Sequence, residues 1–78
     1  MSDTFKEPRR QLDPIIYELR RLRYERGIKL RDLSARAGYS KKTLVQWEGG
    51  HYSPRHTALR DWCDALGVEL ILREKETH

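Results

Sequence analysis

Five glycines divide the sequence into short segments, and their spacing constrains the fold more than any other feature. The segments carry apolar residues three or four positions apart, which gathers side chains on one face of a helix. Glycine adopts the positive φ with which many helices end. The pattern predicts four helices, over residues 14–26, 30–37, 41–48 and from about 54 to 66. The glycines that end them are Gly27, Gly38, Gly49, Gly50 and Gly67.

Residues at the helix starts and on the apolar positions support this assignment. Asp13 is placed to cap the free N–H groups of a helix that begins at Pro14, where the missing proline N–H costs nothing. Ser40 is placed to cap the helix over 41–48 in the same way. Trp47 and Trp62 fall on apolar helical positions, so both are expected in the core.

The composition fits one small, compact, all-α domain. A chain of 78 residues has room for a single core, and a core of that size often depends on oligomerisation. The only cysteine, Cys63, cannot form an internal disulfide, which favours the reducing cytoplasm. Glu69 interrupts the longest apolar run, residues 68–72, so the sequence predicts neither a transmembrane span nor a signal peptide.

Positive charge is concentrated in the middle of the chain. Residues 20–48 contain nine basic and three acidic residues, whereas the remainder contains seven basic and nine acidic residues. Such an asymmetry favours a polyanionic partner. A solvated, arginine-rich helix would give the same count, so charge alone leaves both interpretations open.

The most specific signal is the tripeptide Gly-Tyr-Ser at residues 38–40, between two short predicted helices. Glycine permits a sharp turn, and the serine can start a new helix at once. The second helix would project Lys41, Lys42 and Gln46 from one edge. Two lysines at a helix start oppose the helix dipole, which favours a ligand over a merely solvated face. Because an α-helix fits the DNA major groove, this edge is predicted to read base pairs.

Around this turn the sequence resembles the lambda repressor and Cro-like helix-turn-helix family, also called the XRE-like family. The resemblance covers residues 19–67. It depends on the spacing of all the matching residues and not on any single dipeptide. The matching residues are Leu22, Arg23, Arg26, Gly27, Ile28, Leu33, Ala37, Gly38, Tyr39, Ser40, Thr43, Leu44, Gln46, Trp47, Glu48, Gly50, Pro54, Leu59, Ala65, Leu66 and Gly67. The resemblance implies a compact DNA-binding domain of four to five helices.

The resemblance also implies which residues touch DNA. The expected base-contacting residues are Lys41, Lys42 and Gln46. The expected backbone-contacting residues are Lys29, Arg36, Thr43, Gly50, His51 and Tyr52. Lys29 stands near the place where many members have a DNA-contacting glutamine, so a plain phosphate contact is expected there instead. An ion pair between Arg23 and Glu48 is expected to tie the first helix to the end of the recognition helix.

The first twelve residues differ from the rest of the chain. Residues 1–12 are polar, contain Pro8 and lack periodicity, which predicts a flexible arm. The basic side chains of Lys6, Arg9 and Arg10 either follow the DNA backbone or a minor groove, or belong to a solvated tail. The sequence leaves both interpretations open.

The domain itself is predicted to span residues 13–67, with a separate element over residues 68–78. That element begins with β-branched and aliphatic residues, which predicts a short C-terminal β-strand before a charged tail. One face of the strand would carry Val68, Leu70 and Leu72. A lone strand has no internal partner, so we expect antiparallel pairing with a second copy as the dimerisation element. The competing interpretation folds the segment over its own core, with dimerisation through the last helix or only on DNA.

These features predict a sequence-specific transcriptional regulator located in the cytoplasm, at the nucleoid. We expect a repressor that binds a pseudo-palindromic operator as a homodimer, with recognition helices about 34 Å apart. Repression by blocking promoter access is expected because the chain leaves no room for a ligand-sensing domain. Two alternatives stay open: the antitoxin of a toxin–antitoxin pair, with a toxin as second partner, and a protein-interaction module that does not bind DNA.

The sequence contains no recognisable catalytic or metal-binding set. It has no serine–histidine–acid arrangement and no glycine-rich phosphate loop. His51 and His56 have no second thiolate or carboxylate cluster to join them, so neither a metal nor a cofactor is expected. We therefore expect no enzymatic activity.

Overall fold

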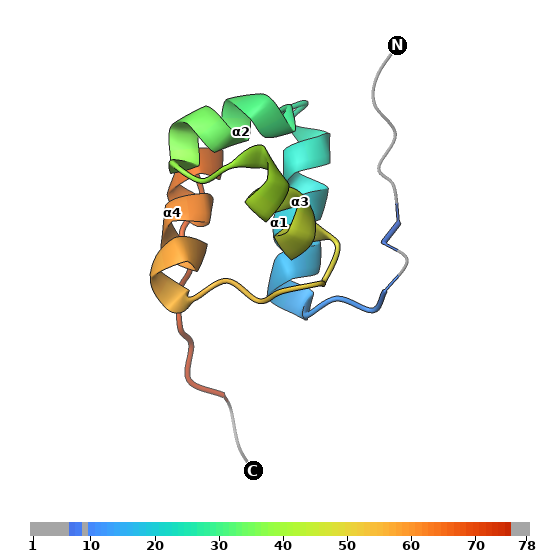
Figure 1. Ribbon diagram of the computed structural model, residues 1–78. Coiled ribbons are helices and arrows are strands. Elements are labelled where there is room, and N and C mark those ends of the chain that lie inside the picture. The colour runs from blue at the N-terminus through green and yellow to red at the C-terminus, as the bar shows by residue number, and fades with distance from the viewer. Residues whose placement is uncertain (1–6, 9, 76–78) are drawn as a thin grey trace.

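The computed structural model describes residues 7, 8 and 10–75, which contain four helices (Figure 1). Their bounds are α1 Pro14–Glu25, α2 Leu30–Ala37, α3 Lys41–Glu48 and α4 His56–Leu66. The all-α fold and the four predicted helices are confirmed. No helix in this part of the chain has the length and hydrophobicity that crossing a membrane requires. Of the basic residues in the predicted arm, Lys6 and Arg9 lie outside the described residues.

Local capping explains where the helices begin and end. The Asp13 carboxylate accepts a hydrogen bond from the N–H two residues later (2.9 Å), and the Ser40 hydroxyl accepts one from the N–H three residues later (3.1 Å). Both predicted caps are therefore confirmed. Gly38 ends α2 at φ +81°, a conformation that glycine adopts without steric cost. Helix α4 begins later than predicted because Arg55 is still extended (φ −69°, ψ 160°).

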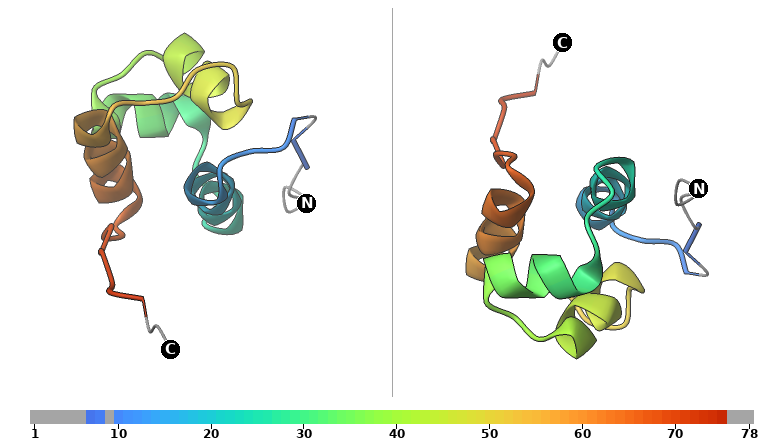
Figure 2. Two further views of the ribbon diagram at one scale, coloured as in Figure 1. Left: turned by 90° about the horizontal axis from the view of Figure 1, so that it is seen from below. Right: turned by 90° about the horizontal axis from the view of Figure 1, so that it is seen from above.

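The four helices pack around one core, and α3 turns its apolar side toward that core and its polar side outward. Leu33, Leu44 and Trp62 are fully buried. The indole rings of Trp47 and Trp62 stack with their centroids 5.9 Å apart, which confirms that both tryptophans are core residues. Helices α1 and α2 each pack against both α3 and α4 (Figure 2). Because Leu44 and Trp47 point inward, the opposite side of α3 faces solvent.

The C-terminal segment differs from its prediction. Residues 68–75 contain no β-strand, so the strand expected over residues 68–72 is not formed in the single chain. The Val68 N–H instead donates to the Cys63 carbonyl oxygen (2.9 Å) and completes the end of α4. No other strand among the described residues offers the ladder of hydrogen bonds that a strand requires. Val68 packs against the core, and the end of the segment then leads away from the helices, where Leu72 is 96% exposed (Figure 1).

Candidate nucleic-acid interface

Hydrogen bonds from two helices hold the turn between α2 and α3. The Ser34 hydroxyl of α2 donates to the Tyr39 carbonyl oxygen (2.5 Å). The Tyr39 hydroxyl donates to Asp61 Oδ2 of α4 (2.8 Å), and this hydrogen bond raises the pKa of Tyr39. The Tyr39 ring also meets Trp47 edge-on, with centroids 5.1 Å apart. These contacts fix the orientation of α3 relative to α2 and α4.

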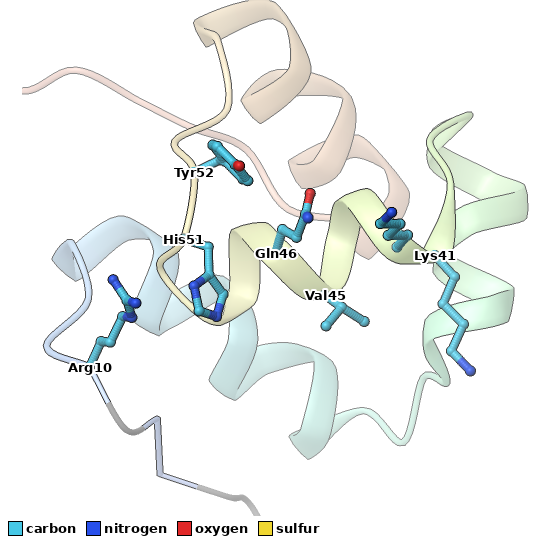
Figure 3. A pocket seen from close by; sticks show the side chains of 7 residues that line it. Arg10, Lys41, Val45, Gln46, His51 and Tyr52 are labelled. Carbon is cyan, nitrogen blue, oxygen red and sulfur yellow. The ribbon is translucent and has the colours of Figure 1, made fainter.

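The outward side of α3 borders an open hollow of about 720 Å³ (Figure 3). The residues that line it are Arg10, Lys41, Lys42, Val45, Gln46, His51 and Tyr52. No acidic residue of the described chain is among them. Lys41 and Lys42 are exposed, Gln46 is half-buried, and neither lysine has an ion pair with a described residue. The structure thus brings the three predicted base-contacting residues together on one cationic surface, which we call the recognition surface.

The loop after α3 extends the recognition surface. His51 and Tyr52 line the same hollow, and the His51 N–H donates to the Gln46 carbonyl oxygen (2.9 Å). Gly50 turns the chain at φ +79°, which glycine adopts readily. Among the described residues, no three histidine, cysteine or carboxylate side chains gather in a group that could hold a metal ion.

The other predicted backbone-contacting residues lie outside this hollow. The Thr43 hydroxyl is 2.9 Å from the Ser40 hydroxyl, so part of its hydrogen-bonding capacity belongs to the cap of α3. Lys29 and Arg36 are exposed at the two ends of α2. They are therefore placed on the helix that precedes the turn and not on α3 itself.

Two residues of the recognition surface were not assigned to it from the sequence. Val45 lines the hollow and is 46% exposed. The signal that identifies it is an apolar residue on the polar side of a helix. The sequence left Arg10 as either a DNA contact or part of a solvated tail, because its position depends on how the segment before α1 packs against the loop after α3.

A buried ion pair supports the recognition surface from beneath. Arg23 Nε donates to Glu48 Oε2 (2.6 Å) and Arg23 Nη2 donates to Glu48 Oε1 (2.9 Å), with both side chains less than a tenth exposed. Arg23 also donates to the Ile28 carbonyl oxygen (2.8 Å), and Arg20 donates to the carbonyl oxygen of Glu48 (2.7 Å). Burial lowers the pKa of Arg23, but the hydrogen bonds and charge of Glu48 outweigh it and raise the pKa. The pair attaches α1 to the C-terminal end of α3 and so orients the recognition surface.

Helices α2 and α3 are short and are joined at a glycine turn. The second of them has one face in the core and a cationic face outward. This arrangement defines a helix-turn-helix domain. Residues 17–75, most of the chain, match the family model described as a helix-turn-helix domain. The protein belongs to this family, which is XRE/Cro-like, and its domain is of the DNA-binding type. A comparison of the sequence with curated proteins gives no match.

Proposed function

We propose that this protein is a sequence-specific regulator of transcription that acts as a repressor, in the cytoplasm, by covering operator DNA. The observation that carries the proposal is the exposed side of α3, which is cationic and has no acidic residue among its described lining. A major groove admits one α-helix, whose outward side chains then reach the base edges. The positive charge attracts the phosphates on either side of that groove.

We assign the base contacts to the outward side chains of α3. Lys41 and Lys42 donate to guanine N7 and O6, and Gln46 forms a pair of hydrogen bonds with adenine. Val45 lies among these polar side chains and is 46% exposed, so it contacts a thymine methyl group. The mixture of cationic, amide and apolar groups suits a defined sequence rather than any DNA.

We assign the contacts with DNA backbone phosphates to residues on either side of α3. Lys29 and Arg36 are exposed at the two ends of α2, where they meet phosphates on one side of the groove. The remaining phosphates are contacted by Thr43, at the first turn of α3, and by the loop over residues 50–52. These contacts use hydroxyl, imidazole and backbone N–H groups. The loop residues in this role are Gly50, His51 and Tyr52.

A homodimer built from the C-terminal segments completes the proposal. Leu70, Ile71 and Leu72 are 41%, 72% and 96% exposed, and Leu70 lines an apolar hollow of about 300 Å³ together with Ile15. Antiparallel pairing of residues 68–72 from two copies, with Val68 and its alternate neighbours on one face, would supply the missing strand partner and cover aliphatic surface. The two-fold axis would set two recognition helices about 34 Å apart on a pseudo-palindromic operator.

Selection of duplexes from a random library by the full chain tests DNA recognition. We expect enrichment of one pseudo-palindromic sequence. Lys41→Ala and Gln46→Ala should each weaken binding to it by about 1–3 kcal/mol and relax the preference at one base pair. Arg60→Ala, an exposed position on α4, is the matched control and should change neither property. A library that stays random after selection would refute the proposal.

Light scattering of the full chain and of a chain truncated after Gly67 tests the dimer. The full chain should have the mass of two copies and the truncated chain that of one. Far-UV circular dichroism of the truncated chain should retain the helical signal, because the four helices end before the deleted residues. A truncated chain that stays fully dimeric would place the interface elsewhere.

The antitoxin of a toxin–antitoxin pair is a second candidate, and it rests on the same exposed surface as the homodimer. The exposed aliphatic run at residues 70–72 suits a different protein as well as a second copy of this chain. Such an antitoxin would bind DNA through α3 and a toxin through this run. A full chain that binds the selected duplex yet stays monomeric in solution would favour the antitoxin over the homodimeric repressor.

A further inference from the structure

The segment before α1 is attached to the domain at two points. The Tyr17 hydroxyl donates to the carboxylate of Glu7, at 3.1 and 3.0 Å from its two oxygens. At the other point, Leu12 packs against the core beside the loop that follows α3. Its Cδ2 atom lies so close to Gly50 that a Cβ added there would be only 2.7 Å away. Arg10, which lies between these points, is therefore held beside the end of α3.

Arg10 lies between the two attachment points and faces the recognition surface. Its Cβ and Cδ atoms are each 3.7 Å from the position of a Cβ added at Gly50, so the aliphatic stem lies against the loop. Figure 3 shows the side chain near His51, at the opposite end of the hollow from Lys41. Arg10 is exposed and has no ion pair with any described residue. Its charge is thus available to a ligand.

We propose that Arg10 and His51 form a binding site for one DNA backbone phosphate, at the edge of the sequence read by α3. The proposal rests on the proposed function, because the phosphate belongs to the same DNA. A guanidinium presents two N–H groups in a fork that matches two phosphate oxygens, and an imidazole N–H adds a further donor. Arg10 precedes the residues 17–75 that match the family, whereas His51 lies within them, so the site joins a residue before the matched region to one inside it.

Leu12 and Gly50 act on this site by positioning Arg10. Gly50 has φ +79° and no side chain, which lets Leu12 approach the loop. Without that contact the arm would sample many positions, and binding would have to order it first. Arg10 is therefore the residue that binds the phosphate, and Leu12 acts through it.

The site is tested by measuring the DNA affinity of the full chain at several salt concentrations. Two duplexes of equal length are used: one selected from a random library, and one whose sequence is unrelated to the selected duplex. One phosphate contact contributes about 0.9 to the slope of log affinity against log salt, or about eightfold between about 1 M and 0.1 M salt. Arg10→Ala should lower both affinities by about that factor at low salt and reduce the slope by about one. The base preference found by selection should not change. Arg10→Lys should keep the slope and lose part of the affinity, because a lysine cannot form the fork.

A double-mutant cycle separates positioning from binding. Leu12→Ala alone should weaken binding, and Arg10→Ala should then have a smaller effect in the Leu12→Ala chain than in the native chain. Urea unfolding of each variant shows that the domain is folded under the binding conditions, and Arg60→Ala controls for the loss of one exposed arginine.

If the native chain binds DNA but Arg10→Ala changes neither affinity nor slope, the phosphate site is refuted and the proposed function stands. If Arg10→Ala alters the base preference, Arg10 contacts a base and the phosphate assignment is wrong. If the native chain binds neither duplex, the proposed function itself fails.

Discussion

Replacing Arg23 with methionine should destabilise the domain severely, although methionine keeps much of the length of the side chain. The substitution removes two hydrogen bonds to the Glu48 carboxylate (2.6 and 2.9 Å) and one to the Ile28 carbonyl oxygen (2.8 Å). Because the Glu48 side chain is only 6% exposed, water cannot solvate the remaining charge in place. Removing one partner of a buried pair costs about 3–5 kcal/mol, against about 0–1 kcal/mol for an exposed pair. A domain of 78 residues has about 4–12 kcal/mol of stability, so the loss is a large part of the total.

Urea unfolding measures this loss. Trp47 and Trp62 are both buried, so their fluorescence reports the loss of the core, and far-UV circular dichroism reports the loss of the helices. Arg21→Met is the matched control, because Arg21 lies on the same helix and pairs with Glu18 and Glu25 while its side chain is 39% exposed. This control should lower the free energy of unfolding by no more than about 1 kcal/mol.

The double variant Arg23→Met with Glu48→Leu removes both charges at once. Its loss in free energy of unfolding should be smaller than the losses of Arg23→Met and Glu48→Leu added together, because no unpaired charge stays buried. Two results would refute the reasoning: a loss in Arg23→Met no larger than that in Arg21→Met, or single losses that simply add in the double variant.

Three further predictions concern the turn and the core. Ser40→Ala should lower the free energy of unfolding by about 1 kcal/mol, because the hydroxyl caps α3; an unchanged urea midpoint would contradict this. Gly38→Ala should cost about 1–2 kcal/mol in the same assay, entirely from the backbone at φ +81°, since a Cβ there would meet no atom within 4 Å. Burial raises the pKa of the Cys63 thiol, which is 3% exposed. The folded protein at mildly alkaline pH should therefore react slowly with a thiol reagent and the urea-unfolded protein quickly; equal rates would show that Cys63 is accessible.

Most of the helix boundaries, though not the start of α4, were predictable because the interactions that set them are local. Asp13 and Ser40 each accept a hydrogen bond from an N–H only two or three residues away. Gly38 and Gly67 end their helices by rotation of their own backbone, to φ +81° and +77°. Each of these features is visible in a window of a few residues, without knowledge of the rest of the fold.

The C-terminal strand was not predictable in this way. The aliphatic composition of residues 68–72 favours an extended strand, but a strand is stable only when a second strand accepts and donates its hydrogen bonds. The described chain offers no such partner, and the Val68 N–H is used by α4. Whether this segment becomes a strand therefore depends on a second molecule and not on its own residues.

The sequence by itself determined the helices, the glycine turn and the side of α3 that faces outward, because each depends on residues a few positions apart. Only the tertiary structure decided what lies around that side. The family resemblance implied the pairing of Arg23 with Glu48, which are 25 positions apart, but the contact exists because α1 and α3 pack on one core. Arg10 joins the recognition surface for the same reason: Leu12 packs beside Gly50, far along the chain, and no local pattern encodes that approach.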